Sequence, residues 1–339
     1  IGAGGIRIPF GPEASMDTAP ASTERVGTGV ARLDELLAGG PYRGSSLLIS
    51  GRPGTAKSTL AACFAETTAE RGERALYVSF DEMQAPYVRN LASVGIDLQP
   101  HIDRDRIRFC ARTASAGVIP EHVLALEHHI DDFQPHTLVI DPVSALLKAG
   151  GGVSARNAVE RILALTRQRG ITSIMTSLTD EDDPEGEATI ASVSTVADTW
   201  IVLDYNVRAG ERNRSLSVVK SRGSGHSNQQ RELLLSDGGV DLADVYEYGT
   251  EVLMGTARAQ KQNEEDEAAR RRAMERARRR QDLERRIEHT RSELERLSTE
   301  LALEEEQTED FDRTTRRHQQ EVRDRRQPDS ALENQGDSE

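Results

Sequence analysis

The chain contains 339 residues, of which 36% are hydrophobic, 29% charged and 4% aromatic, so it is long enough for one sizeable α/β domain with an extension. Its formal net charge of −14 disfavours nucleic acid as the main partner, because an acidic surface is repelled by a polyanionic backbone. No stretch reaches the roughly 18 apolar residues of a membrane span, and no leader of the secretory type opens the chain, which predicts a cytoplasmic protein without membrane contact.

The two cysteines, Cys63 and Cys110, lie in apolar surroundings without a metal or redox spacing, and are predicted to be buried, reduced thiols.

The first 23 residues are predicted to precede the main domain. Residues 1–15 begin with Ile1 and read as a strand and a loop that continue from an upstream segment. Residues 16–24 are rich in Ala, Ser, Thr and Pro and show no periodic apolar face, which is typical of a linker. We therefore expect residues 1–23 to be the tail of a preceding domain and a linker, and the main domain to cover residues 24–255.

From residue 46 onward, short apolar runs rich in β-formers alternate with helical stretches. This alternation predicts an α/β fold with a mostly parallel sheet and helices on both faces. Three later runs follow one another without a helix between them, so the sheet is expected to end in an antiparallel meander. The alternating runs lie at 46–50, 74–80, 106–111, 137–143 and 172–178, and the later ones at 199–207, 214–222 and 231–236.

Residues 256–325 differ from the rest of the chain, because they consist of strong helix formers without Gly or Pro and predict one long charged helix. Large apolar residues recur in it at alternating spacings of four and three, as in the seam of a coiled coil. The apolar part of the seam covers fewer than three heptads, and a single solvated helix is the alternative. Residues 326–339 are polar and predicted to be disordered. The seam consists of Leu283, Ile287, Thr290, Leu294, Leu297 and Leu301, with Arg276, Arg280 and Glu304 where its register continues.

The stretch GRPGTAKST, residues 51–59, nearly matches a phosphate-binding loop, and it follows an apolar strand and precedes a helix. Ala56 stands where the pattern has its second Gly. We expect binding to persist because the anion site is made by backbone N–H groups, and an Ala is tolerated if position 56 lies near helical geometry. Lys57 would contact the β- and γ-phosphates of ATP and Ser58 would supply a hydroxyl to Mg²⁺; a Gly-rich turn with an exposed Lys is the alternative. The predicted nucleotide-binding residues of this loop are Gly51, Pro53, Gly54, Thr55, Ala56, Lys57, Ser58 and Thr59.

Three carboxylates follow predicted strands and are expected at the same edge of the sheet as the loop. Asp141 ends the run HTLVID, where a buried strand would deliver a ligand for Mg²⁺. Asp81 and Glu82 follow the strand after the loop helix and could orient water or accept a hydroxyl proton. The alternative for all three is an acidic residue that caps the next helix.

Four stretches, which include GRPGTAKST, VSFDE, TLVIDPVSAL and KSRGSGHS, resemble the KaiC family of circadian clock ATPases, which are RecA-like P-loop proteins, and specifically their second, C-terminal ATPase domain. The similarity spans about residues 24–255, and residues 1–15 resemble the end of the family's first ATPase domain. The resemblance implies a homo-hexameric ring with ATP between subunits and transfer of phosphate to a neighbouring Ser/Thr pair.

The resemblance also assigns roles to particular residues. It makes Ser194 and Thr195 the phosphoacceptors, although these residues alone would read as a polar strand edge. Glu82, with Asp81, becomes the general base. Lys220 and Arg222 match the cations that reach across the interface to the neighbour's γ-phosphate; ordinary strand-end cations are the alternative.

The sequence departs from the family after residue 255, because the charged helix replaces the short tail on which a KaiA partner acts. Dependence on KaiA is therefore not expected, and the helix is a candidate for joining two rings or binding another partner. In the family, a KaiB-type partner binds mainly through the first domain, which lies outside residues 24–255.

Three functions from different classes follow. The first is an ATP-hydrolysing serine/threonine autokinase in circadian or timing-type signalling, with return of phosphate to ADP as an associated reaction. The second is a RecA- or RadA-like DNA-dependent ATPase, which the acidic balance and scarce aromatics disfavour. The third is an interaction protein in which nucleotide only holds subunits together.

Overall fold

The computed structural model describes residues 22–114, 118–150, 152–179, 193–208, 210–226, 229–243, 246–248 and 251–326. The chain divides into two compact units, Ile1–Ala259 and Gln260–Glu339. Nearly all of the predicted leading segment 1–23 and all but the first residue of the predicted tail 326–339 lie outside the described residues.

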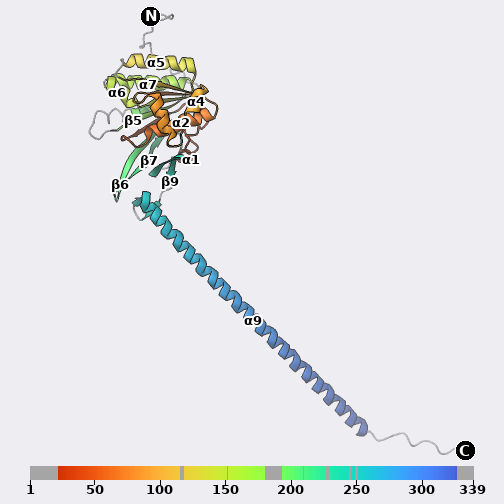
Figure 1. Ribbon diagram of the computed structural model, residues 1–339. Helices are drawn as coiled ribbons and strands as arrows, with labels where there is room; N and C mark the ends of the chain where they lie inside the picture. The colour runs from red at the N-terminus through yellow and green to blue at the C-terminus, as the bar shows by residue number, and fades with distance from the viewer. Residues whose placement is uncertain are drawn as a thin grey trace, which may run out of the picture. The chain divides into compact units, whose positions relative to one another are not determined.

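A nine-stranded sheet forms the centre of the first unit, in the order β3-β2-β4-β5-β1-β6-β7-β8-β9 (Figure 1). The first six strands in this order, β3, β2, β4, β5, β1 and β6, are parallel to one another. The last four, β6, β7, β8 and β9, pair antiparallel. The strands are β1 (Ser46–Gly51), β2 (Ala75–Ser79), β3 (Ile107–Ala111), β4 (Thr137–Asp141), β5 (Thr172–Leu178), β6 (Thr199–Arg208), β7 (Glu211–Ser221), β8 (Arg231–Ser236) and β9 (Gly239–Ala243).

The predicted α/β class, parallel sheet and terminal meander are confirmed, with two corrections. The run at 199–207 does not belong wholly to the meander, since β6 pairs parallel with β1, Leu47 facing Thr199. The connection over residues 179–198 is long enough for the crossover that a parallel neighbour requires. Strand β9 was not predicted, because its five residues, GVDLA, are too short and too polar to stand out.

Helices cover both faces of the sheet because the strands of its parallel part are apolar on both sides. Leu47 and Ile49 of β1 pack in one core with α1, α2 and α3, whereas Leu48 packs in the other core with α5, α6 and α7. Figure 1 shows α5, α6 and α7 gathered on one side of the sheet and α2 on the other. The helices are α1 (Ala31–Leu36), α2 (Lys57–Glu70), α3 (Gln84–Ala92), α4 (Gln99–Asp103), α5 (Ile119–Phe133), α6 (Val143–Gly150) and α7 (Gly152–Gln168).

The cysteine prediction holds for one residue and fails for the other. Cys63 on α2 is buried, and burial raises the pKa of its thiol to about 12. Cys110 is only half-buried, because β3 is an edge strand of the sheet. Both thiols are free.

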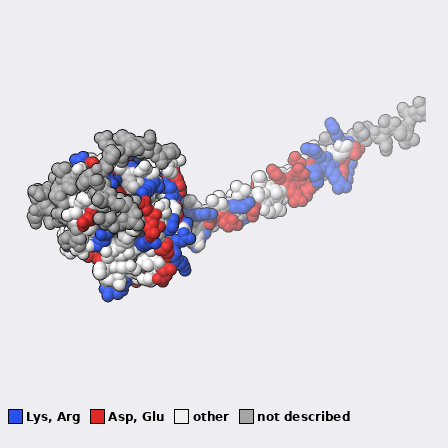
Figure 2. Space-filling model, turned by 90° about the horizontal axis from the view of Figure 1, so that it is seen from above, with Lys and Arg blue, Asp and Glu red and all other residues white. Residues whose placement is uncertain are grey.

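The predicted long helix is confirmed as α9, Gly255–Arg326, which follows a hairpin of β10 (Tyr246–Tyr248) and β11 (Glu251–Leu253). Its amino terminus is held by two carboxylates of the meander: Gly255 N donates to Glu232 Oε1 at 3.0 Å and Thr256 N to Glu211 Oε2 at 3.2 Å. These carboxylates satisfy N–H groups that have no partner within the helix. Beyond residue 260 the surface of α9 is dominated by charged side chains (Figure 2). Among the described helices, none is both long enough and apolar enough to cross a membrane.

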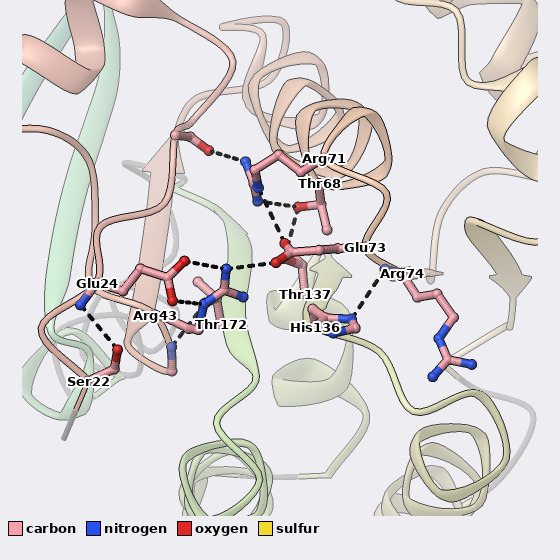
Figure 3. Close-up of polar contacts among 12 residues, drawn as sticks. Ser22, Glu24, Arg43, Thr68, Arg71, Glu73, Arg74, His136, Thr137 and Thr172 are labelled. Atoms are coloured by element: carbon pink, nitrogen blue, oxygen red, sulfur yellow. Dashed lines mark hydrogen bonds and ion pairs between the residues drawn. The ribbon is translucent and has the colours of Figure 1, made fainter. Parts of the chain in front are cut away.

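The amino-terminal edge of the parallel strands is closed by a polar network (Figure 3). Arg43, in the loop before β1, donates to Glu24 at 2.6 Å and to Glu73, before β2, at 2.7 Å. On the same edge Gly44 N donates to Thr172 Oγ1, at the start of β5, at 3.0 Å. These contacts connect the segments that precede β1 and β2 and the start of β5 at the amino-terminal edge. The loops that follow β1, β2 and β4 lie at the opposite, carboxyl-terminal edge.

Candidate nucleotide site and acceptor cluster

The loop between β1 and α2 wraps around a buried lysine. Lys57 Nζ donates to the main-chain oxygens of Gly51 and Arg52, both at 2.8 Å, and the residue is only 7% exposed. Burial lowers the pKa of Lys57 to about 8, although the charge of Asp141 opposes this shift. The ammonium group is thus held beneath the loop by carbonyl oxygens, in a position typical of a phosphate-binding lysine.

Ala56 does not have the helical geometry that the sequence interpretation required. Its φ is 76° and its ψ 29°, which is the left-handed region, and α2 begins at the next residue. For an L-residue with a Cβ atom this conformation costs on the order of 1 kcal/mol, a cost that the usual Gly avoids. The loop therefore keeps its shape at the expense of local strain.

Glycine is required elsewhere in the loop for steric reasons. A Cβ on Gly51 would lie 2.2 Å from the carbonyl oxygen of Leu203, and one on Gly54, at φ 78°, would lie 2.7 Å from the hydroxyl oxygen of Tyr205. Thr55 is fully buried and donates from Oγ1 to the carbonyl oxygen of Arg52 at 2.8 Å. The side chain of Thr55 therefore holds the loop and does not face a ligand.

Asp141 lies at the end of β4, 6% exposed, and both of its oxygens accept hydrogen bonds. Ser58 Oγ donates to Oδ1 at 3.1 Å, and Thr176 on β5 also donates to Oδ1. Tyr77 on β2 donates to Oδ2 at 2.7 Å. The hydroxyl of Tyr77 also contacts that of Tyr87, which donates to the main-chain oxygen of Ser58 at 2.9 Å. The predicted pair of Ser58 and Asp141 is thus brought together by hydroxyls from two strands and from α3.

The sequence interpretation did not include these supporting hydroxyls. Tyr77 and Thr176 sit within apolar strand runs, and a hydroxyl in a fully buried strand is the signal that could have pointed to them. Burial, together with the charge of Asp141, raises the pKa of both Tyr77 and Tyr87 well above the usual tyrosine range. Both phenols therefore stay protonated and can donate.

Asp81 and Glu82 follow β2 and are exposed at the rim of the same site. Partial burial and repulsion from Asp141 raise the pKa of each carboxyl, and Asp81 adds to the effect on Glu82. Together with the phosphate-binding loop and Asp141 they line a cleft of about 470 Å³. The unpredicted lining residues are Pro142, Leu178, Leu235 and Arg214, whose Nε donates to the carbonyl oxygen of Gly54 at 3.1 Å.

The other four predicted residues form a separate cluster, defined here as the acceptor cluster: Ser194, Thr195, Lys220 and Arg222. Lys220 Nζ donates to the main-chain oxygen of Ser194 and Arg222 Nη2 to that of Thr195, both at 2.6 Å. Ser194 is buried, whereas Thr195 is exposed.

The acceptor cluster lies on the amino-terminal side of the sheet. Thr199, the first residue of β6, pairs with Leu47 near the start of β1 and with Ser221 at the end of β7, whereas the loop follows Gly51, which pairs with Leu203. Four residues of strand, or about 13 Å along the sheet, separate these two levels. One chain therefore places its nucleotide cleft and its acceptor cluster at different edges.

Asp198, also not predicted, connects the acceptor cluster to the sheet. Its Oδ2 accepts hydrogen bonds from Ser46 N at 2.9 Å and Ser46 Oγ at 2.7 Å, and Arg167 Nη2 lies 3.1 Å away. Burial alone would raise the pKa of Asp198, but these bonds and the arginine charge lower it below the usual value. Asp198 therefore remains a carboxylate, 3.9 Å from Arg222 Nη1.

Comparisons with known proteins identify relatives over most of the chain. The family model described as "ATPase: KaiC" matches residues 26–247. The chain is 37% identical over 290 residues to the circadian clock protein KaiC2 of Synechocystis sp., an overlap that covers 85% of this chain and 51% of that protein. It is 34% identical over 268 residues to the circadian clock oscillator protein KaiC of Thermostichus vulcanus, covering 78% and 51%, and 33% identical over 254 residues to that of Synechococcus elongatus, covering 74% and 48%.

The chain thus spans about half the length of these curated relatives. Because the matched segment contains the whole nucleotide cleft and the acceptor cluster, and covers more than half of the chain, the protein belongs to the KaiC ATPase family.

Proposed function

We propose that this protein binds ATP in the cleft around Lys57 and transfers the γ-phosphoryl group to Ser194 and Thr195 of a neighbouring copy, with hydrolysis of ATP as the accompanying activity. The observation that carries the proposal is the position of the acceptor cluster on the opposite side of the sheet from the cleft. A cleft and an acceptor that cannot meet within one chain can meet between two.

The residues of the cleft fit a magnesium–triphosphate complex. Backbone N–H groups at the start of α2 and the Lys57 ammonium would hold the phosphates. Mg²⁺ prefers oxygen ligands and commonly takes one or two from protein and the rest from phosphates and water, which suits Ser58 Oγ and Asp141 Oδ1, 3.1 Å apart. When bound, the ion would neutralise phosphate charge.

The exposed rim supplies the remaining chemistry. Glu82, with its raised pKa, would accept the proton of the attacking hydroxyl as the new P–O bond forms and ADP leaves with the electrons of the broken bond. Asp81 is one methylene shorter and is the secondary candidate. Lys220 and Arg222, arriving with the acceptor chain, would stabilise the charge on the transferring phosphoryl group.

This arrangement requires a ring in which every cleft faces a neighbour's acceptor cluster, and we propose the homo-hexamer that the family resemblance implies. Phosphorylation adds close to two negative charges beside Lys220 and Arg222, which gives a physical route from chemistry to subunit contacts. Timing-type signalling, as in the relatives named for the circadian clock, is the setting proposed. A KaiB-like partner would act through a preceding domain, and dependence on KaiA is not proposed.

The test mixes two inactive variants. Lys57→Ala chains would lack nucleotide binding, and Ser194→Ala/Thr195→Ala chains would lack acceptors. After co-assembly with γ-labelled ATP, label is expected on the Lys57→Ala chains. Label on the wild type but not on the mixed Lys57→Ala chains would refute transfer between copies, and absence of label from wild-type assemblies would refute the kinase proposal.

A further inference from the structure

Helix α9 presents a stripe of large apolar side chains that no described part of the chain covers. The exposed fraction is 65% for Ile287 and 66% for Leu294, and the other members of the stripe are similar. They lie on the coiled-coil seam, in a helix whose remaining surface is mostly charged. A continuous apolar stripe of this spacing is typical of a helix that packs against another helix.

The seam extends beyond its leucine-rich centre. Continued with alternating spacings of three and four, it passes through Ala273 and Ala269 toward the amino terminus, and through Phe311 and Val322 toward the carboxyl terminus. Phe311 is 73% exposed. The pattern therefore runs along most of α9, with charged residues at only a few seam positions.

Two blocks of opposite charge flank the apolar centre. The basic block, residues 270–280, contains seven arginines and one glutamate, and the acidic block, residues 304–314, contains six carboxylates and one arginine. Figure 2 shows the acidic stretch of α9, followed near the end of the helix by a further basic stretch that is not part of the basic block. In a parallel, in-register pair each block would face its own copy, whereas in an antiparallel pair basic faces acidic.

We propose that α9 pairs with α9 of a second copy in an antiparallel coiled coil in which Arg280 of each chain faces Glu304 of the other. This register places seam residues opposite one another throughout, with an apolar centre. Its layers, each occurring twice by symmetry, are Thr290 with Leu294, Ile287 with Leu297, Leu283 with Leu301, Arg280 with Glu304, Arg276 with Thr308, and Ala273 with Phe311.

Registers shifted by one heptad are less favourable in the pairing of charges and in side-chain packing. A shift of one heptad in one direction puts Arg280 opposite Leu297, and a shift in the other direction puts it opposite Phe311. Either shift buries an arginine against an apolar side chain without a carboxylate, which is costly. Ala273 opposite Phe311 also matches a small residue to a large one, as close packing favours.

The contacts of Arg280 within its own helix do not oppose this pairing. Arg280 Nε lies 2.9 Å from Glu284 Oε1, but both side chains are more than half exposed, at 82% and 60%. Such a surface pair contributes little, and Arg280 can contact Glu304 of the second copy without a net loss.

Antiparallel pairing determines which copies are joined. The two amino termini of the paired helices would lie about 110 Å apart, given a rise of 1.5 Å per residue. Helices that leave one ring on the same side would pack parallel, so an antiparallel partner must come from a different ring. The antiparallel pairing rests on α9 alone and stands or falls independently of phosphoryl transfer, whereas the joining of two rings also rests on the ring that the proposed function requires.

Disulfide trapping tests the polarity in the full chain. A Leu283→Cys/Leu301→Cys chain is expected to form a covalent dimer on mild oxidation, whereas each single substitution stays at the level of the wild type, whose Cys63 and Cys110 provide the control. Positions 283 and 301 are about 27 Å apart along one helix, so a disulfide within a chain is excluded. Dimers from either single variant would show parallel pairing, and no dimer from the double variant would show no pairing; both outcomes overturn the proposal.

A charge exchange tests the register without cysteines. Arg280→Glu places Glu opposite Glu304 in two layers and is expected to weaken association of full chains by about tenfold or more in sedimentation. The combined Arg280→Glu/Glu304→Arg exchange restores both layers and should return association to the wild-type level. In a parallel, in-register pair like charges would face one another at 280 and at 304 in the wild type and in both variants, so none of these changes would alter association strongly. An Arg280→Glu variant that associates like the wild type, or a combined exchange that does not restore association, overturns the proposal.

Discussion

Lys220 donates a hydrogen bond from Nζ to the main-chain oxygen of Ser194 at 2.6 Å, so a cation and a hydroxyl-bearing residue from distant parts of the sequence meet at one edge of the sheet. Arg222 makes the equivalent contact with Thr195. In the proposed transfer between copies, a neighbour's cleft would therefore receive acceptor and cation together, as one preformed surface.

Removing these cations should therefore reduce turnover and leave nucleotide binding to the isolated chain intact. For Lys220→Ala and Arg222→Ala we expect phosphoryl transfer in the assembly to fall on the order of 10²-fold each, because transition-state charge loses a donor. ATP affinity of the unassembled chain, measured by fluorescence titration, should stay within about twofold, since a factor of two is under 0.5 kcal/mol. Arg104→Ala, on another exposed loop, is the matched control; a loss of ATP binding in the unassembled Lys220→Ala chain would contradict the separation of the two sites.

Because the backbone of Ala56 is strained, replacing it with glycine is expected to raise the free energy of unfolding, whereas such a substitution usually lowers it. Ala56→Gly should stabilise the folded protein by about 0.5–1 kcal/mol, because relief of the positive-φ conformation exceeds the greater chain entropy of glycine in the unfolded state. The same substitution at Ala61, in the buried interior of α2, should destabilise by about 1 kcal/mol or more. Urea denaturation of both variants measures the difference, and destabilisation by Ala56→Gly would argue against the left-handed geometry.

Tyr77 should matter for magnesium although it lies outside the cleft. Tyr77→Phe removes one of the hydrogen bonds that hold Asp141 and leaves the Tyr87 hydroxyl with one partner fewer. We expect a loss of stability of about 1–2 kcal/mol and a rise of severalfold in the Mg²⁺ concentration needed for half-maximal ATP binding. Tyr42→Phe, which removes a hydroxyl bonded to Gly223 O at 3.2 Å, is the control and should leave the Mg²⁺ midpoint unchanged.

The parts of the fold that could be predicted are those governed by local pattern. Apolar runs and a loop between a strand and a helix identified the parallel sheet and the cleft, since the carboxyl ends of parallel strands meet at one edge. The long α9 followed from composition alone. Strand β9 and the parallel pairing of β6 depend on tertiary contacts, and no local pattern distinguishes them.

The residues of the site divide in the same way, into those set by local motifs and those brought together only by tertiary contacts. Lys57, Ser58 and Asp141 belong to motifs with fixed spacing, so their meeting was expected. The hydroxyls of Tyr77 and Thr176 reach Asp141 from two different strands, and the hydroxyl of Tyr87 on α3 contacts that of Tyr77; only the folded arrangement reveals these contacts. Tolerance of Ala56 was made conditional on helical geometry, and that condition is not met, because spacing identifies the missing glycine but not its conformation.

Lys57 should make ATP binding dependent on pH above neutrality. In the free protein, burial lowers the pKa of Lys57 to about 8 from the ordinary lysine value of 10.5, so charged Lys57 opposes folding below pH 8 and this cost fades as the pH rises toward 10.5. A bound triphosphate favours the charged form and raises the pKa again. Above pH 8, binding must therefore take up a proton, and the affinity should fall by up to tenfold per pH unit, since each unit corresponds to about 1.4 kcal/mol.

Calorimetric titration of ATP at pH 9 in buffers of different ionisation enthalpy measures this proton directly. We expect an uptake approaching one proton per nucleotide at pH 9 and none from Lys57 at pH 6.5, where the ammonium is already charged in the free protein. Lys57→Arg provides the control, because a guanidinium stays protonated at both values. If the wild type takes up no proton at pH 9, the ammonium is not desolvated beneath the loop, and the proposed grip on the phosphates must be revised.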